Sequence, residues 1–169
     1  MLNTSCSKKL LPHGGDIRSE ALIYGLKPDR INDFSVNINP LTHPGYLRNL
    51  LLDNIQSILS YPDSDASLLK EAVSDYLRVP PENILIGNGS IELIFNIVSG
   101  YNIKSALIFG PAFSEYERAV ILNKGKTRYL FSDEKNDFRA DFKNKKTFKD
   151  FDAAFILNPN NPTGAVAKK

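Results

Sequence analysis

Short apolar segments and helical segments alternate along the second half of the chain, and this alternation constrains the fold more than any other feature. Residues 83–87, 105–109, 126–131 and 152–157 are predicted strands, and residues 90–99 and 113–123 are predicted helices. The segment 90–99 is apolar on nearly all sides and is therefore expected to be buried. A strand–helix order of this kind favours a mainly parallel sheet with helices on both faces. We therefore predict an α/β fold.

The first half of the chain is predicted to be less regular. Gly and Pro are dense in residues 1–45, which we expect to form an irregular N-terminal arm with one short helix over residues 17–24. Two further helices are predicted over residues 47–59 and 65–78, the second with Asp65 as its N-cap. A soft boundary near residue 45 therefore divides the arm, 1–45, from the α/β part, 46–169.

The composition of the chain excludes several classes of protein. Of its 169 residues, 42% are hydrophobic and 24% are charged, which is too apolar for a disordered segment. One Cys and two His argue against a disulfide framework and a metal site, so no metal ligand is assigned. A net charge of +2 gives no reason to expect nucleic acid, and no apolar run approaches the roughly 20 residues of a membrane span. The N-terminus lacks the pattern of a signal peptide, so a cytoplasmic location is the default.

A glycine-containing turn precedes the predicted helix 90–99. Gly87 and Gly89 permit tight backbone turns, and the helix N-terminus presents unpaired N–H groups at the positive end of its dipole. Ser90 adds a hydroxyl donor. The turn can therefore hold a phosphate group, or Asn88 or Ser90 can simply cap the helix. The motif is neither a Walker A loop nor G-x-G-x-x-G, so it does not support nucleotide binding.

A second loop, at residues 157–164, carries three Asn and two Pro directly after a predicted strand. Ligands of open α/β sheets bind beyond the carboxyl ends of strands. Because Pro162 favours an extended conformation at Asn161, the Asn161 amide can donate to a ligand oxygen. The alternative is a turn-rich surface loop, since Asn and Pro are frequent in turns.

Two aromatic residues are further candidates for ligand contact. Phe113 follows a predicted strand, where it can lie over a flat ligand ring or pack into the core at a helix start. Tyr61 lies in a turn between two predicted helices. Its hydroxyl can reach a ligand or partner, or its ring can pack locally with the hydroxyl in water.

The order of these motifs resembles the fold-type I pyridoxal-phosphate enzymes, in the class II aminotransferase branch that contains histidinol-phosphate aminotransferase. The matching segments are Tyr61-Pro62-Asp63 and residues 87–94, 111–116 and 158–164. The arm segments 11–17 and 33–41 are similar to those of the threonine-phosphate decarboxylases of cobalamin biosynthesis, with Asp16 in place of their Asn. The resemblance implies the N-terminal portion of the fold-type I fold.

The resemblance implies cofactor contacts for five positions. Gly89, Ser90 and Ile91 would hold the phosphate of pyridoxal 5'-phosphate. Phe113 would stack on its pyridine ring, and Asn161 would donate to its phenolic oxygen. Residues 46–169 would then form an incomplete cofactor-binding large domain.

Four other positions are implied to bind the substrate or a partner subunit. Tyr61 is similar to a Tyr that reaches the cofactor phosphate of the neighbouring subunit, which implies a homodimer. His13, Ser35 and Asn37 lie in the arm that helps to bind a small phosphorylated amino acid. Residues 1–45 would thus contribute to the small domain and the substrate site.

The implied activity is pyridoxal-phosphate-dependent decarboxylation of O-phospho-L-threonine to an aminopropanol phosphate, with a histidinol-phosphate-type aminotransferase as the alternative. In this family the Schiff-base Lys, the Asp beside the pyridinium nitrogen and the carboxylate-binding Arg follow the Asn-Pro-Thr-Gly loop, but this chain ends five residues after Gly164. We therefore expect the N-terminal part of a longer enzyme or a truncated gene product, without a catalytic residue and inactive alone. A non-catalytic binding fragment is the remaining hypothesis.

Overall fold

The computed structural model describes residues 14–39, 41, 44–138 and 148–166. These residues fall into two compact units that meet in the sequence between Ile84 and Leu85. The described residues up to Ile84 form the N-terminal unit, and those from Leu85 onward form the C-terminal unit. Each unit has its own helices. The expected division into an arm, 1–45, and a large domain, 46–169, concerns the complete enzyme and stays a prediction.

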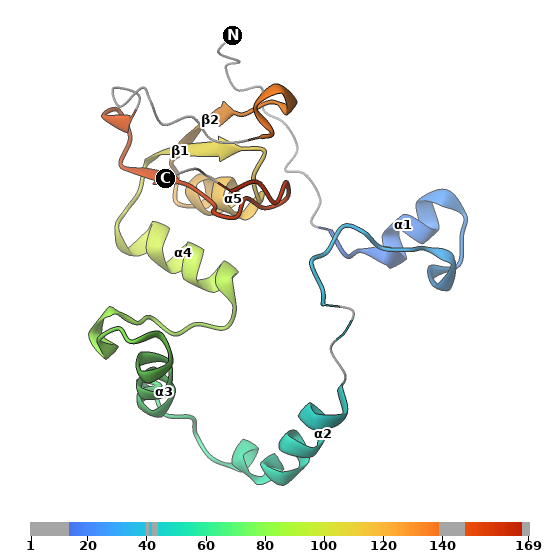
Figure 1. Ribbon diagram of the computed structural model, residues 1–169, viewed down its shortest axis with the longest axis vertical. Helices are drawn as coiled ribbons and strands as arrows, with labels where there is room; N and C mark the ends of the chain where they lie inside the picture. Colours follow the sequence, from blue (N-terminus) through green and yellow to red (C-terminus); the bar gives the residue numbers. More distant parts are fainter. Residues whose placement is uncertain (1–13, 40, 42–43, 139–147, 167–169) are drawn as a thin grey trace. The chain divides into compact units, whose positions relative to one another are not determined.

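The C-terminal unit is built on a parallel three-stranded sheet. Its strands are β1 (Ser105–Gly110), β2 (Lys126–Phe131) and β3 (Ala153–Phe155), in the order β2-β1-β3. Ser105 lies opposite Lys126, and Ala106 lies opposite Ala153. Helix α4 (Ser90–Gly100) precedes β1, and α5 (Glu115–Leu122) connects β1 to β2 (Figure 1). The predicted α/β fold with a parallel sheet is confirmed in this unit.

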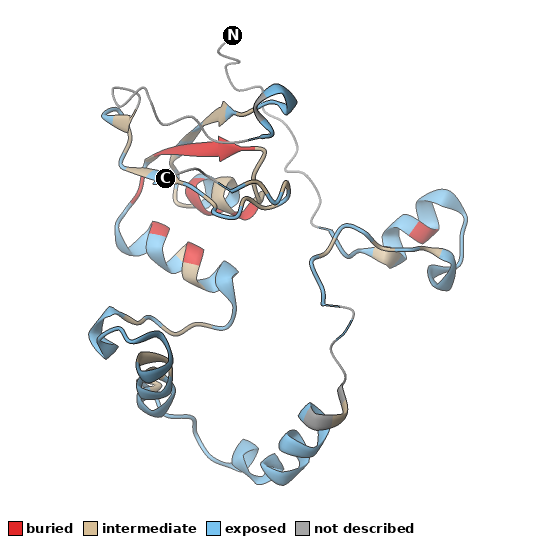
Figure 2. Ribbon diagram, in the orientation of Figure 1, coloured by how far each residue is buried: buried red, intermediate tan, exposed pale blue. Residues whose placement is uncertain are grey.

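The core of the C-terminal unit forms where α4 and α5 meet the central strand β1. Its buried cluster consists of Ile94, Val98, Ile103, Ala106, Ala119 and Val120. Figure 2 shows β1 buried, because this strand alone of the three described strands has a neighbour on each side. On the other face of β1, Phe109 stacks on Phe148 with ring centroids 5.8 Å apart.

The predicted strand over residues 83–87 is wrong. Pro81–Asn83 form a short 3-10 helix, η3, and residues 84–87 are irregular in the described structure. An apolar run indicates that a segment can be buried, but a strand also needs a neighbouring strand with which to form hydrogen bonds. The described sheet consists of β2, β1 and β3 alone, and residues 84–87 pair with none of these strands.

The expectation that the helix over residues 90–99 is buried is also wrong. Only Ile94 and Val98 of α4 are buried, whereas Ile91 and Ile97 are 40% and 43% exposed. The helix packs on α5 along one side, and no other described element of the C-terminal unit covers its remaining apolar surface. An all-round apolar pattern shows what a helix can bury, and the surroundings decide how much it does bury.

The N-terminal unit contains only helices as regular elements in the part that the structure describes. They are α1 (Ile17–Tyr24), η1 (Pro28–Arg30), α2 (Pro44–Asp53), η2 (Ile55–Leu59), α3 (Ser67–Leu77) and η3. The predicted helix 17–24 is confirmed. Asp16 caps it by accepting the N–H of Ser19 at 3.1 Å. The Ser19 side chain first, and then this backbone bond, lower the pKa of the Asp16 carboxyl.

The single helix predicted over residues 47–59 is divided by Asn54. The Asn54 side-chain amide donates to the carbonyl of Leu50 at 2.9 Å. A side chain that takes the carbonyl four residues back competes with the main-chain helix bond. Helix α2 therefore ends at Asp53, and the chain continues as the 3-10 helix η2.

Asp65 is not the N-cap of the next helix, α3, as predicted, because the N-cap position is occupied by Ala66. Ala66 precedes the helix with a φ of 50°, and the helix begins at Ser67. The carboxylate of Asp63 accepts the N–H groups of Asp65 and Ser67 at 3.1 and 2.5 Å. These bonds, with that to Asp65 first, lower the pKa of the Asp63 carboxyl. Thus the Asp of the Tyr61-Pro62-Asp63 turn organises the helix entry.

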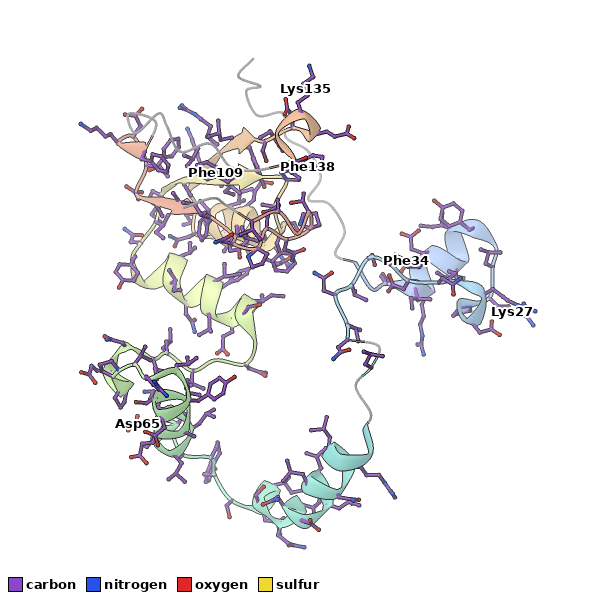
Figure 3. All side chains as sticks on the ribbon, in the orientation of Figure 1. Lys27, Phe34, Asp65, Phe109, Lys135 and Phe138 are labelled. Carbon is purple, nitrogen blue, oxygen red and sulfur yellow. The ribbon has the colours of Figure 1, made fainter. Side chains whose placement is uncertain are left out.

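Large apolar side chains are exposed throughout the N-terminal unit. Ala21 is the one buried apolar residue among its described residues, while Phe34 is 95% exposed. Figure 2 shows the contrast with the buried β1, and Figure 3 shows Phe34 extending from the segment that follows α1. None of the described helices is long and apolar enough to span a bilayer.

Candidate cofactor-binding site

Two loops leave the same edge of the sheet in the C-terminal unit. β1 ends at Gly110 and continues to Phe113, while β3 ends at Phe155 and continues into the Asn-rich loop of residues 158–164. β1 and β3 pair in parallel, with Ile108 opposite Phe155, so both carboxyl ends lie at one edge (Figure 1). Open α/β sheets bind their ligands at this edge.

Asn160 joins these two loops. Its side-chain amide donates to the carbonyl of Pro111 at 2.9 Å and to the hydroxyl of Thr163 at 2.9 Å. Its backbone N–H donates to Ala165, and its carbonyl accepts from Gly164, at 2.8 and 2.7 Å. The Asn-rich loop is therefore closed on itself and tied to the loop that carries Phe113.

Phe113 lies at the border between the core and this edge. It is half-buried and meets Tyr116 edge-on, with ring centroids 6.1 Å apart and an interplanar angle of 85°. Tyr116 in turn lies 4.8 Å from the ring of Phe155, and burial raises the pKa of the Tyr116 hydroxyl. Phe113, Tyr116 and Phe155 all pack against the buried core cluster. The Phe113 ring is therefore held both by the core and by its contact with Tyr116.

The turn before α4 has the backbone conformation that a glycine permits. Gly89 is the N-cap residue with a φ of 87°, and a Cβ built there meets no heavy atom within 4 Å. No described side chain caps the helix, so the alternative in which Asn88 or Ser90 caps it is wrong. The first N–H groups of an α-helix have no partner within the helix. At α4 they belong to Ser90 and Ile91, which are exposed.

Glu92 holds this turn from within the helix. Its carboxylate accepts the backbone N–H of Asn88, which lies four residues earlier in the chain. The turn is also closely packed, because a Cβ at Gly87 would lie 2.7 Å from Leu93 Cδ2. The result is a fixed turn followed by an exposed helix N-terminus.

Helix α4 is oriented by its C-terminal end. Asn123, at the end of α5, donates its amide to the carbonyls of Val98 and Ile103 at 3.3 and 3.0 Å. The C-terminal ends of α4 and α5 therefore meet at the amino edge of β1. In Figure 1 the N-terminus of α4 lies on the side toward which the β1 and β2 arrows point. The structure thus places Gly89, Phe113 and Asn161 in one unit and on the carboxyl side of its sheet.

The described parts of the two arm segments identified in the sequence, from residue 14 in the first, are packed together in the N-terminal unit. The N–H of Gly15 donates to the Ser35 hydroxyl at 2.9 Å, and this hydroxyl donates to Asp33 at 2.6 Å. A Cβ at Gly14 would lie 2.5 Å from the carbonyl oxygen of Ser35. The backbone at Gly14 therefore approaches Ser35 as closely as a glycine allows.

The remaining predicted residues also belong to the first part of the chain. Tyr61 is fully exposed within the N-terminal unit, at 101%, and Asn37 is exposed. His13 lies outside the described residues. In the described parts of the chain, no group of three or more His, Cys, Asp or Glu side chains could hold a metal ion.

Two residues in the site were not assigned a role from the sequence. Asn160 is one of three Asn in the loop, and the sequence singles out only Asn161, which precedes Pro162. Glu92 follows Gly89 by three residues, which is the spacing of a capping box and could have predicted its contact with the turn.

Comparison with known proteins identifies the family to which the chain belongs. The family model described as "Aminotransferase class I and II" matches residues 31–169. Threonine-phosphate decarboxylase of Salmonella typhimurium is 38% identical over 158 residues, which cover 93% of this chain and 43% of that protein. The adenosylcobalamin biosynthesis bifunctional protein CobDQ of Leptospira interrogans is 36% identical over 164 residues, covering 93% of this chain and 19% of that protein.

A solved structure supports the same fold. The histidinol-phosphate aminotransferase of Clostridium acetobutylicum has a TM-score of 0.70 and 30% identity, over 82% of this chain and 41% of that one. The chain thus spans about two fifths of the length of the decarboxylase and of this aminotransferase. It belongs to the aminotransferase class I and II family, with the fold-type I fold.

Pyridoxal phosphate is the cofactor of this family, and the described residues fit it. The cofactor carries an anionic phosphate, which the exposed N-terminus of α4 can accept through the N–H groups of Ser90 and Ile91, whereas the Gly89 N–H donates to the Gly87 carbonyl at 2.9 Å. It also carries a flat aromatic ring and a phenolic oxygen. Phe113 and Asn161 supply an aromatic face and an amide donor on the same side of the sheet.

Proposed function

We propose that the protein containing this chain is a pyridoxal-phosphate-dependent lyase that decarboxylates O-phospho-L-threonine to an aminopropanol phosphate in cobalamin biosynthesis. The observation that carries the proposal is the packing of Gly14 and Gly15 on Ser35. These residues belong to the two arm segments that resemble the threonine-phosphate decarboxylases. The 38% identity to a decarboxylase and the similarity to CobDQ support it.

The C-terminal unit would hold the cofactor. The turn at Gly89 and the backbone N–H groups of Ser90 and Ile91, with the Ser90 hydroxyl, would bind its phosphate. Phe113 would lie on its pyridine ring, and Asn161 would donate to its phenolic oxygen. When bound, the cofactor supplies an electron sink for a bond broken at the substrate Cα.

The arm would hold the substrate. His13, Ser35 and Asn37 would bind the phosphorylated amino acid, and the Ser35 hydroxyl, which accepts from Gly15 and donates to Asp33, holds this part of the arm together. Substrate orientation decides the reaction, because the bond perpendicular to the cofactor ring is the one that breaks. Holding the carboxylate group in that position selects decarboxylation, whereas holding the Cα proton there selects transamination.

A homodimer follows from the proposed role of Tyr61. Its side chain is fully exposed in the N-terminal unit, and it would reach the cofactor phosphate of the neighbouring subunit. We propose a cytoplasmic enzyme with small-molecule substrates and with neither nucleic acid nor a membrane as partner. The 169 residues contain no position matching the Schiff-base Lys, so we expect them to be inactive when produced alone.

A histidinol-phosphate-type aminotransferase is the second candidate, because the aminotransferase of C. acetobutylicum is similar in fold and 30% identical. Incubation of the whole protein with pyridoxal phosphate and O-phospho-L-threonine tests the two candidates. Mass spectrometry should detect an aminopropanol phosphate. Formation of glutamate from 2-oxoglutarate with histidinol phosphate as amino donor, and no aminopropanol phosphate, would favour the aminotransferase.

The third candidate is a non-catalytic fragment that uses only the phosphate-binding turn. Borohydride reduction in the presence of pyridoxal phosphate distinguishes it from an enzyme. Covalent labelling of a lysine in the whole protein would exclude this candidate, and unlabelled protein without a visible absorption band would support it.

A further inference from the structure

Asn160 and Asn161 are neighbours in sequence, and the hydrogen bonds of Asn160 indicate that it has a structural role, whereas we assign a cofactor contact to Asn161. An asparagine amide nitrogen carries two donor hydrogens. At Asn160 one is directed to the carbonyl of Pro111 and one to the hydroxyl of Thr163, both at 2.9 Å. Both hydrogens are therefore used inside the protein, which leaves none for a ligand.

The main chain at Asn160 is fixed as well. Its N–H donates to Ala165 at 2.8 Å, and its carbonyl accepts from Gly164 at 2.7 Å. The N–H of Ala165 also donates to the Thr163 hydroxyl at 3.2 Å. Asn161 is thus attached by one peptide bond to a half-buried residue held at four points.

The bond from Asn160 to Pro111 crosses between two loops that are 49 residues apart in sequence. Pro111 lies two residues before Phe113, so this bond sets the separation of the Phe113 loop from the Asn161 loop. A ligand ring held by both loops would be sensitive to that separation. Small displacements of a donor weaken its hydrogen bond steeply.

We propose that Asn160 is a positioning residue that fixes the Asn161 amide relative to Phe113, and thereby sets the strength of the Asn161 hydrogen bond to the cofactor's phenolic oxygen. This inference rests on the proposed cofactor contacts of Asn161 and Phe113. A donor beside an anionic oxygen favours the deprotonated cofactor. Displacement of Asn161 therefore raises the pKa at which the cofactor's visible absorption band titrates.

The test uses the whole protein loaded with pyridoxal phosphate, and its readout is the visible spectrum as a function of pH. Asn161→Ala removes the direct donor and should raise the pKa of the band by about one unit. Asn160→Asp has nearly the same shape but lacks both donors, and should raise it in the same direction. Loss of the Asn161 hydrogen bond to the cofactor should lower the affinity for pyridoxal phosphate about fivefold.

Thr163 supplies a matched pair of variants if Asn160→Asp does not fold. Thr163→Ser keeps the hydroxyl acceptor and should leave the titration unchanged. Thr163→Val removes it and should shift the band in the direction of Asn161→Ala, by a smaller amount. A purely structural role would lower the melting temperature without moving the titration of the correctly loaded protein.

The outcomes separate the inference from the proposed function. A normal wild-type band that shifts in Asn161→Ala but not in Asn160→Asp or Thr163→Val overturns the positioning role alone. A wild-type protein with no cofactor band overturns the proposed function and the inference that rests on it. Shifts in all three variants, with Thr163→Ser unchanged, are the expected result.

Discussion

The N–H of Gly15 donates to the Ser35 hydroxyl at 2.9 Å, which joins two arm segments 20 residues apart. The same hydroxyl donates to Asp33 at 2.6 Å, and the Asp33 carboxylate also accepts the Ser35 N–H at 2.7 Å. These bonds, led by that of the side chain, lower the pKa of the Asp33 carboxyl. A single hydroxyl therefore organises the part of the arm that we assign to substrate binding.

Replacement of Ser35 by Ala tests that assignment. Loss of the hydroxyl removes both bonds, so the KM for O-phospho-L-threonine should rise about fivefold or more, with a smaller change in kcat. Steady-state kinetics of the whole enzyme measures both. Ser57→Ala, in an exposed position of η2, is the matched control and should behave as wild type. Equal kinetics for the two variants would remove Ser35 from the substrate site.

Gly89→Ala tests the phosphate-binding turn. Its φ of 87° is strained for any residue with a Cβ, and the added methyl group would enter the open space beside the helix N-terminus. We expect a loss of roughly 1–2 kcal/mol in stability and at least a tenfold loss of affinity for pyridoxal phosphate. Fluorescence titration with the cofactor measures the affinity.

A second positive-φ glycine separates strain from ligand binding. Gly25, at the C-cap of α1, has a φ of 64° and is equally free of neighbours within 4 Å. Gly25 lies in the left-handed region, with a ψ of 28°, so Gly25→Ala should cost less stability than Gly89→Ala and leave the cofactor affinity unchanged. If both variants lose affinity equally, the effect at Gly89 is one of folding rather than of phosphate binding.

Glu92 offers a pair of variants that test how the turn is held. Glu92→Gln keeps an oxygen that can accept the Asn88 N–H, so pyridoxal phosphate should bind within about threefold of wild type. Glu92→Ala leaves that N–H without its acceptor and should weaken binding by about tenfold. Isothermal titration with pyridoxal phosphate measures both. Tighter binding by the Ala variant would mean that the carboxylate opposes the phosphate instead of holding the turn.

The pH dependence of stability should reflect Asp152. Its carboxylate accepts the N–H groups of Lys104 and Ser105, each at 2.8 Å, and these bonds lower its pKa below 3.8. A lowered pKa in the folded state adds stability above the ordinary value, and that stability is lost as the pH falls through the folded value. Asp152→Asn should therefore lower the melting temperature at pH 7.

The difference between wild type and Asp152→Asn should shrink as the pH falls below about 3.8. Melting curves by circular dichroism between pH 2 and 7 measure it. Asp150→Asn, at an exposed position nearby, is the control and should melt as wild type. A constant difference between Asp152→Asn and wild type at all pH values would contradict an ionic origin.

Local patterns predicted the elements that depend on local chemistry. The apolar run within residues 105–109 predicted β1, and the Asp16 cap and Gly25 end accompany the helix predicted at residues 17–24. The turn before α4, to which we assign phosphate binding, was expected from Gly89 and the helix behind it. These features need no knowledge of what lies beside them.

Features that depend on distant partners were not predicted. Residues 83–87 are apolar enough for a strand, but in the described structure no strand is placed to pair with them. Asn160 and Asn161 are chemically identical, and the bond from Asn160 to Pro111, 49 residues away, could not be read from the loop itself. The exposed side of α4 likewise depends on packing that its own sequence does not specify.

Release of carbon dioxide from carboxyl-labelled O-phospho-L-threonine tests the central claim most directly. The whole protein, loaded with pyridoxal phosphate and supplied with 2-oxoglutarate, should release one labelled carbon dioxide for each aminopropanol phosphate formed, without producing glutamate. Retention of the label in a keto acid, with glutamate formed in equal amount, would contradict the decarboxylase assignment and establish transamination instead.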